Sequence, residues 1–516
     1  MNEYFLEKVG QIRASIPDSE MWTSKIKSKM VNRNSNLEFR HVTVQKVRKL
    51  LKSLSSSRST GVDELDNYSV KLAADYIAQP LHHIVTLSLL QQKLPSAWKY
   101  SKVLPLHKKG ELLERKNYRP VAMLSPLSKV LEKIVFEELY TYFYDQRLFH
   151  PSLHGYRKHR STQSALLQLY DRWVRAASGG QLSSVVLLDL SAAFDLVDPQ
   201  LLLQKLKLYG AGDEALRWLE SYLTERKQAV WIDHSMSGFL SCEVGVPKGS
   251  NLGPLLFLIF YNDLPDYLSC DVEAYADDTT ISVAGDSVEE IRRKLTINCQ
   301  VVSHWMLRNK LKLNAEKTHL MTVGTQRRLQ MQDENVVVYM DNCRLGESED
   351  KCETLLGCLI EPGLKWHKQV NHLITKLKKR LTALTNLRNV LPHKARKNIT
   401  QGIFTSVLVY CLPVFGGLDK NEIQSLQVMQ NKAARLVTHS ALRVPRREIF
   451  TQLEWLTVNQ LIFYHSALTT YRIRERKEPE YLNNWLSRDN ERGNIMVENT
   501  KLSLAKISFC FRSSAQ

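Results

Sequence analysis

The sequence Val185-Val-Leu-Leu-Asp-Leu-Ser-Ala-Ala-Phe-Asp195 begins with an apolar run, Val185 to Leu190, that only Asp189 interrupts. Such a run is typical of a strand buried on both faces. An unpaired carboxylate in a buried strand is costly, so Asp189 needs a compensating charge. That charge is either a structural salt-bridge partner or a divalent cation, which offsets the cost of burial. The residues alone leave both readings open.

A second acidic point lies at Asp277-Asp278. Residues 272–283 around it are predicted to form two short strands joined at this pair. Hairpin turns usually contain Gly or Asn, and two adjacent carboxylates repel each other unless something neutralises them. If the Asp189 strand lies beside this hairpin, three carboxylates converge at one sheet edge, which suits Mg²⁺. Two such ions about 4 Å apart can hold the attacking and leaving oxygens of a phosphoryl displacement.

The rest of the chain alternates helical and extended patterns. Asp198-Pro199 and Gly210 frame a leucine-rich helix, as N-cap, first helical residue and C-terminal stop. The remaining predicted helices cover residues 68–94, 127–149, 161–177, 254–261 and 287–310, and most of the chain from 361 to 475. The remaining predicted strands cover residues 101–107, 117–124, 319–323 and 353–360.

Composition narrows the class of protein. Of 516 residues, 43% are hydrophobic and 24% charged, which excludes a disordered or fibrous chain. The 71 Lys and Arg exceed the 53 Asp and Glu by 18, which indicates a polyanionic partner. The longest apolar run, Pro254 to Tyr261, is too short to span a membrane, so nucleic acid is favoured over lipid.

A basic stretch and the cysteines support this interpretation. From Pro362 to Leu418 there are ten Lys or Arg and no Asp or Glu, which favours a phosphate-binding helical face over an ordinary solvated one. None of the eight cysteines has C-x-x-C spacing, so a structural zinc site is not expected. We therefore predict free thiols in an intracellular protein.

Several blocks, in this order, resemble those of reverse transcriptases, and most closely those of jockey-like non-LTR retrotransposons (long interspersed elements). The blocks are Trp98 to Lys109 with Asn117-Tyr-Arg-Pro120, Asp189 to Asp195, Gly245-Val-Pro-Lys-Gly-Ser-Asn-Leu-Gly-Pro-Leu-Leu-Phe257 with Asn262-Asp263-Leu264, Tyr275-Ala-Asp-Asp278, Leu313-Asn-Ala-Glu-Lys-Thr318, Leu355-Leu-Gly357, and Leu426 to Thr438. The resemblance covers roughly the whole chain, and it is the order of the blocks that makes it specific.

The resemblance implies an α+β right-hand polymerase. Its parts would be an N-terminal helical extension (1–45), fingers (46–180), an antiparallel-sheet palm with the catalytic aspartates (181–345), a primer grip and helical thumb (346–400), and a C-terminal helical region (401–516). The resemblance also leads us to expect a chain without the upstream endonuclease of many such elements and with a truncated end, as in a fragment of a longer polyprotein.

The resemblance also implies roles for individual residues. Asp189, Asp277 and Asp278 would bind two Mg²⁺ ions, with Mn²⁺ as an alternative, and Lys317 would protonate the leaving pyrophosphate. Phe194 would exclude a 2′-hydroxyl, unless it is simply a core residue. The other implied nucleotide-binding residues are Lys108, Arg119, Ala192, Ala193, Lys248 and Gly249, and the primer-grip residues are Leu356 and Gly357. Asp195 and Asp263 fit the pattern and are interpreted as structural.

Lys248 departs from the family pattern, which usually has Gln there. A lysine adds charge and loses the amide's acceptor, so activity is expected to be lowered rather than absent. Two alternatives to an active reverse transcriptase stay open. One is a catalytically impaired remnant that still binds RNA, and the other is another palm polymerase, such as a group II intron maturase or an RNA-dependent RNA polymerase. Phe194 argues against a ribonucleotide polymerase.

The implied reaction is template-directed attack of a primer 3′-hydroxyl on a deoxynucleoside triphosphate. The implied partners are an RNA template, in vivo the element's own transcript, and a DNA primer, with no membrane. The resemblance also implies a nuclear location, although the sequence has no clear import signal: Lys378-Lys379-Arg380 lies inside a predicted binding helix.

Overall fold

The structure is a computed structural model that describes residues 1–486 except 32, 34–35, 333, 342 and 347–350. The chain divides into two compact units. The first comprises residues 1–156, 189–269 and 299–314; the second comprises 157–188, 270–298 and the described residues from 315 onward. Separate helices and sheets in both units confirm the predicted α+β class.

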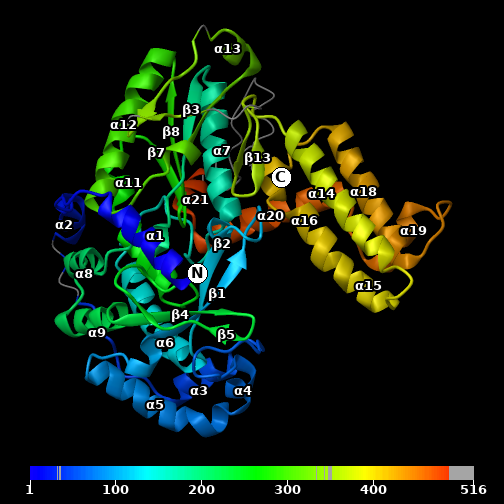
Figure 1. Ribbon diagram of the computed structural model, residues 1–516. Coiled ribbons are helices and arrows are strands. Elements are labelled where there is room, and N and C mark those ends of the chain that lie inside the picture. The colour runs from blue at the N-terminus through cyan, green and yellow to red at the C-terminus, as the bar shows by residue number, and fades with distance from the viewer. Residues whose placement is uncertain (32, 34–35, 333, 342, 347–350, 487–516) are drawn as a thin grey trace. The chain divides into compact units, whose positions relative to one another are not determined.

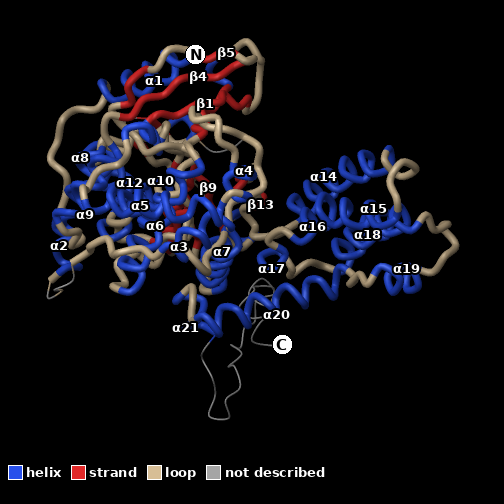
Figure 2. Tube along the Cα trace, turned by 90° about the horizontal axis from the view of Figure 1, so that it is seen from below, coloured by secondary structure: helices blue, strands red, loops and turns tan. Residues whose placement is uncertain are grey.

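The first unit is built on a mixed five-stranded sheet. Strand β1 pairs antiparallel with β2 and parallel with β4, and β4 also pairs with the short strands β5 and β6. Helix α1 lies against β4 and β6 (Figure 2). The elements are α1 (Asn2–Ala14), α2 (Ser24–Met30), α3 (Val44–Lys52), α4 (Asn67–Leu72), α5 (Ala74–Leu90), β1 (Tyr100–His107), β2 (Tyr118–Met123), α6 (Pro126–Asp145), α8 (Pro199–Leu208), α9 (Asp213–Leu223), β4 (Arg226–Ile232), β5 (Ser235–Met236), β6 (Leu240–Cys242), α10 (Gly253–Tyr261) and α11 (Leu264–Tyr267).

The second unit is built on an antiparallel sheet in the order β7-β8-β3-β9. Helix α7 packs on β3, β7 and β8, and helices α14, α15 and α18 pack together as a bundle (Figure 1). The elements are α7 (Thr162–Ser178), β3 (Leu182–Leu188), β7 (Asp271–Tyr275), β8 (Asp278–Gly285), β9 (His319–Val323), α13 (Gln326–Gln330), β10 (Tyr339–Met340), β11 (Cys343–Arg344), β12 (Glu353–Leu355), β13 (Cys358–Ile360), α14 (His367–Asn386), α15 (His393–Thr400), α16 (Ser406–Val409), α17 (Leu412–Phe415), α18 (Lys420–Thr438), α19 (Arg446–Leu453), α20 (Val458–Arg476) and α21 (Glu480–Leu486). Helix α12 (Val288–Arg308) contributes residues to both units.

Local signals located many elements correctly. The Asp198 side chain accepts hydrogen bonds from the backbone N–H groups of Gln200 and Leu201 at the start of α8, as an N-cap does. Gly210 follows the end of that helix with φ of 86°, a conformation that glycine adopts at little cost. The β1–β2 hairpin and strand β9 also form where the sequence predicts them.

Three local predictions were wrong. Residues 353–360 are not one strand but a hairpin, because Leu356 and Gly357 both take positive φ and turn the chain back. The single helix predicted over residues 68–94 is two helices, α4 and α5, and α5 ends at Leu90. Strand β3 ends at Leu188, so Asp189 follows the strand rather than interrupting it.

Each unit has its own core. Fully buried aromatic side chains, including Phe143, Trp218 and Phe257, fill the first unit. A cluster that includes Trp173 and Trp366 joins α7, the sheet and the later helices in the second unit. Among the described helices, none combines the length and the apolar character that crossing a membrane requires.

Candidate active site

The Asp277-Asp278 pair lies at the turn of the β7–β8 hairpin in the second unit. Tyr275 pairs with Asp278, so Ala276 and Asp277 form the connection and Asp278 begins β8. Ala276 takes φ of 59°, an uncommon conformation for a residue with a Cβ. Both aspartates are exposed. Two carboxylates therefore reach solvent from one tight turn, as oxygen ligands for a hard cation would.

Strand β3 lies beside this hairpin in the same sheet, with Leu188 opposite Thr279. Asp189 is the next residue of the chain, so its Cα lies about 3.8 Å from that of Leu188. Its backbone carbonyl accepts a hydrogen bond from Asn314 N at 2.9 Å, and its side chain is half-buried. The free-energy cost of burying the Asp189 carboxylate is therefore smaller than the cost expected for full burial.

The segment after Asp189 is held by aromatic packing in the first unit. Ala192 takes φ of 51°, and Ala193 begins a 3-10 turn, Ala193–Asp195. The Phe194 ring stacks on Phe257 of α10, with centroids 4.4 Å apart. The Tyr156 ring meets Phe194 edge-on at 6.2 Å. Because α10 is buried, these contacts fix the orientation of the half-buried Phe194 ring.

The loop 245–249 is hydrogen-bonded on both sides within the first unit. Val246 N donates to Phe194 O at 2.9 Å, and Ala122 N of β2 donates to Lys248 O at 2.7 Å. Gly249 has φ of 110°, and a Cβ there would collide with the Ala122 carbonyl oxygen. Glycine is therefore required for the close approach of this loop to β2. The loop connects the Phe194 segment to the β1–β2 hairpin.

Lys248 has a partner inside the protein. Its Nζ lies 2.5 Å from Asp195 Oδ2, and the two side chains are similarly buried. The lysine that departs from the family pattern is thus matched by a carboxylate 53 residues away in sequence. Sequence patterns did not reveal this pairing, which reinforces the contact between the loop and the Phe194 segment. The nucleotide contact implied for Lys248 stays a prediction.

The predicted phosphate-binding residues lie on the β1–β2 hairpin. Arg119 lies opposite Leu106 in the ladder, and Lys108 N donates to Asn117 O at the turn. Both basic side chains are exposed. The hairpin therefore presents two cations near one end.

The remaining predicted residues lie in the second unit. Lys317 ends the 3-10 turn Ala315–Lys317 and is exposed. Leu356 and Gly357 form the β12–β13 turn, and the Tyr410 hydroxyl donates to Leu356 O at 2.7 Å. Tyr410 had no sequence signal of its own.

Lys205 is a further residue that the sequence analysis missed. Its ammonium lies 2.6 Å from Asp263 Oδ1, and both side chains are fully buried. Burial lowers the pKa of Lys205, while Asp263 opposes that shift. Trp305 Nε1 donates to the other Asp263 oxygen at 3.1 Å. These contacts give Asp263 a structural role, as the sequence analysis interpreted it. The sequence signal that could have identified Lys205 as its partner is a charged residue inside a leucine-rich helix.

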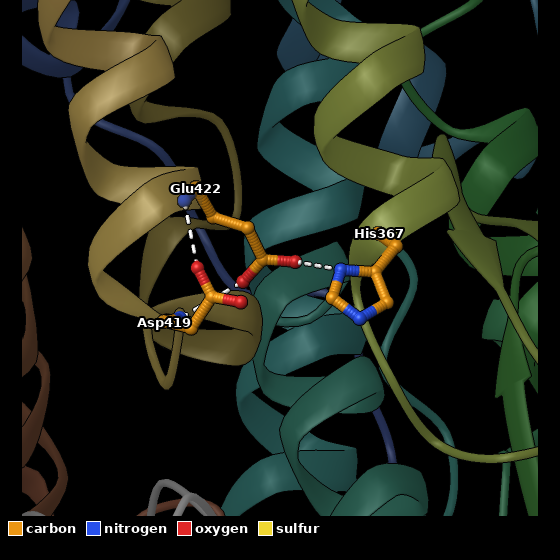
Figure 3. Close-up of side chains that lie close together, drawn as sticks. All are labelled: His367, Asp419 and Glu422. Atoms are coloured by element: carbon orange, nitrogen blue, oxygen red, sulfur yellow. Dashed lines mark hydrogen bonds and ion pairs between the residues drawn. The ribbon is translucent and has the colours of Figure 1, made fainter.

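Among the residues that the structure describes, one other group of side chains has the composition of a metal site. The ligand atoms of His367, Asp419 and Glu422 lie within 4.8 Å of one another (Figure 3). Asp419 and Glu422 form the capping box of α18, and His367 Nδ1 lies 2.6 Å from Glu422 Oε1. These contacts form the cap of α18 and join it to the start of α14. Both helices begin here, and the partial positive charge at a helix N-terminus disfavours a bound cation.

The stretch from Pro362 to Leu418 forms α14 to α17 and presents a basic surface. Lys376, Lys378, Lys379 and Arg380 are all exposed on α14. The stretch supplies no carboxylate to offset them. This arrangement suits a nucleic-acid backbone.

Comparisons with known proteins find a matching family model and several curated relatives. The family model for reverse transcriptase (RNA-dependent DNA polymerase) matches residues 106–384. In Drosophila melanogaster, the probable RNA-directed DNA polymerase from transposon BS is 26% identical over 85% of this chain and 49% of its own length. The RNA-directed DNA polymerase from mobile element jockey, also from D. melanogaster, is 24% identical over 80% of this chain and 46% of its own length. The chain thus spans about half the length of these curated relatives.

Proposed function

This chain belongs to the reverse transcriptase family, and on that premise we propose that it is an RNA-directed DNA polymerase of a jockey-like non-LTR retrotransposon. It would extend a primer 3′-hydroxyl with deoxynucleoside triphosphates on an RNA template. The observation that carries the proposal is the β7–β8 hairpin, which presents two carboxylates next to strand β3, the strand that Asp189 directly follows.

The carboxylates of Asp189, Asp277 and Asp278 would hold two divalent cations. The fit rests on the donor set, since the hairpin offers exposed carboxylate oxygens, the ligands that Mg²⁺ prefers. When bound, Mg²⁺ lowers the pKa of the primer hydroxyl and stabilises the charge that develops at phosphorus. The exposed Lys317 would donate the proton that the pyrophosphate takes as it leaves.

The incoming nucleotide would be bound by residues from several elements. Arg119 and Lys108 would contact the triphosphate from the β1–β2 hairpin, and the backbone N–H groups of Ala192 and Ala193 would orient it. The Phe194 ring, fixed by its stacking on Phe257, would exclude a 2′-hydroxyl. The loop at Gly249 would place backbone close to the nucleotide.

Nucleic acid would be held by the remaining elements. The exposed lysines of α14 would neutralise template–primer phosphates, as a thumb does, and the β12–β13 turn at Leu356 and Gly357 would contact the primer end. The β1–β2 hairpin would belong to the fingers, and the sheet that contains β3, β7 and β8 would be the palm. The template would be the element's own transcript, and copying would take place in the nucleus.

The test is primer extension on poly(rA) with an oligo(dT) primer, dTTP and Mg²⁺. Asp277→Asn should lower kcat/KM at least a hundredfold, about 2.7 kcal/mol at 1.36 kcal/mol per decade. Asp286→Asn makes the same chemical change at an exposed position just past β8 and should leave the rate unchanged. EDTA should abolish extension by the unsubstituted chain.

Two results would contradict the proposal. Equal activity in Asp277→Asn and the unsubstituted chain would show that the hairpin carboxylates are not catalytic. No extension by a folded chain that binds RNA would favour the catalytically impaired remnant, and rescue by Lys248→Gln would locate the impairment.

A further inference from the structure

Glu132 lies inside helix α6 and is fully buried in the first unit. Its neighbours in the helix include four buried apolar residues, Val130, Leu131, Ile134 and Val135. A glutamate is almost never fully buried unless its carboxylate is paired, because removing the charged group from water is costly. The proposed polymerase chemistry gives this residue no role, so its burial needs another explanation.

The Glu132 carboxylate accepts a hydrogen bond from the backbone of the loop that precedes α10. Asn251 N donates to Glu132 Oε2 at 2.7 Å. Asn251 Nδ2 donates to the carbonyl oxygen of Lys129, one turn earlier in α6, at 2.9 Å. The backbone and the side chain of one loop residue are thus both bonded to the same turn of α6, which fixes the loop against that helix.

A short hydrogen-bonded turn joins Asn251 to the preceding residues. Ser250 Oγ donates to the carbonyl oxygen of Pro247 at 2.7 Å and accepts from Gly253 N at 2.9 Å. Because these bonds make the turn compact, the position of Asn251 determines that of Gly249. Gly249 is exposed, and its backbone is the part of the loop that would come close to the nucleotide.

The segment of chain that holds this turn also carries a proposed phosphate contact. Strand β2 is followed directly by helix α6. Strand β2 bonds the loop through Ala122 N and Lys248 O, and α6 bonds it through Glu132. Arg119 lies on β2 as well. A shift of the loop relative to this segment would therefore separate two groups that are proposed to contact one nucleotide.

We propose that Glu132 is a positioning residue that holds the 247–251 turn in place against β2 and α6 and thereby strengthens binding of the incoming deoxynucleoside triphosphate. This role rests on the proposed polymerase function, to which it adds a residue that does not touch the nucleotide. Burial raises the pKa of Glu132, while Arg226 and the backbone N–H of Asn251 oppose that shift. A neutral carboxyl still accepts the hydrogen bond, as does the amide oxygen of glutamine, so the position supplies an acceptor rather than a charge.

The test is steady-state primer extension on poly(rA) with oligo(dT), Mg²⁺ and varied dTTP. Glu132→Leu removes the acceptor and keeps a buried side chain, so it should raise KM for dTTP about tenfold, as expected for the loss of one buried hydrogen bond, and leave kcat nearly unchanged. Glu132→Gln keeps the acceptor and should behave like the unsubstituted chain. Glu138→Leu makes the same change at a half-buried position on another face of α6 and should leave both constants unaltered.

A second measurement needs no catalysis. Hydrogen–deuterium exchange over residues 246–254, followed by mass spectrometry, should be about tenfold faster in Glu132→Leu, because Asn251 N loses its acceptor. Glu132→Gln and Glu138→Leu should keep the slow exchange of the unsubstituted chain. If Glu132→Leu does not fold, Asn251→Ala tests the same contact from the exposed side. It removes the bond to the Lys129 carbonyl and should raise KM for dTTP and speed exchange of the loop by smaller factors.

The proposal is overturned if Glu132→Leu, shown by thermal melting to be folded, keeps the KM and the loop exchange of the unsubstituted chain. A fall in kcat at unchanged KM would also overturn it, because Glu132 would then affect only the amount of active protein. A folded unsubstituted chain that extends no primer would refute the polymerase proposal instead. In that chain, faster exchange in Glu132→Leu would still support the contact with the loop, and unchanged exchange would overturn it.

Discussion

The ion pair between Lys248 and Asp195 gives the sharpest prediction about the 245–249 loop. The two side chains are only 26% and 25% exposed, so the pair is shielded far more than a surface salt bridge. Neutralising either partner by Lys248→Gln or Asp195→Asn leaves the other charge partly buried and should cost about 2 kcal/mol of unfolding free energy. The double variant leaves no unpaired charge and should cost about 2.5 kcal/mol rather than 4, a coupling of about 1.5 kcal/mol.

The same double-mutant cycle should also show coupling between the two residues in catalysis. The pair reinforces the contact between the loop and the Phe194 segment, so each single variant should lower kcat/KM for dTTP about tenfold, the equivalent of about 1.4 kcal/mol. The double variant should recover most of that loss. Lys207→Gln, at an exposed lysine of α8 in the same unit, is the control and should match the unsubstituted chain.

The assay is urea unfolding followed by fluorescence, together with steady-state primer extension. The reasoning is refuted if Asp195→Asn has no effect on either measurement while Lys248→Gln raises KM for dTTP, because Lys248 would then act on the nucleotide directly. A coupling near zero would refute it equally, since two charges that do not interact give additive effects.

Three further predictions concern stability. Gly249→Ala should prevent normal folding of the 245–249 loop, because the new Cβ would collide with a carbonyl oxygen of β2. Gly10→Ala in α1, where the new Cβ meets nothing within 4 Å, should instead stabilise the folded protein by up to about 1 kcal/mol. Thermal melting of both variants checks this. Lys205→Met should cost about 3–5 kcal/mol in urea unfolding because it leaves Asp263 buried without its partner, and a cost below about 1 kcal/mol would contradict it. Tyr410→Phe should cost about 1 kcal/mol and speed hydrogen exchange at the β12–β13 turn, and unchanged exchange there would count against the hydrogen bond.

The elements that the sequence located correctly are those whose ends are marked by local signals, such as caps and turn residues, within a few residues of each other. Helix α8 could be placed from Asp198, Pro199 and Gly210, since a cap, a first-turn proline and a left-handed glycine act on their own backbone. The β7–β8 hairpin followed from strand patterns on both sides of Asp277. The resemblance to a family that the comparisons confirm also rested on short, ordered blocks.

The errors arose where a pattern is locally ambiguous. The apolar run around Asp189 reads as a strand through Leu190, and only the end of the ladder with β8 decides that the strand stops at Leu188. Most of residues 353–360 are apolar or β-branched, which suits a strand, but Gly357 disfavours one, and the positive φ of Leu356 next to it, which no local preference favours, turns them into a hairpin.

The sequence by itself determined the class of fold, the order of the blocks and the identity of the candidate catalytic carboxylates, because these depend on residue type and short spacing. Only the tertiary structure decided that Lys248 meets Asp195 and that Lys205 meets Asp263. Likewise, only packing decided that Glu132 is buried against the loop before α10. These contacts join residues far apart in the chain, and their energies depend on burial and distance, which periodicity and composition do not encode.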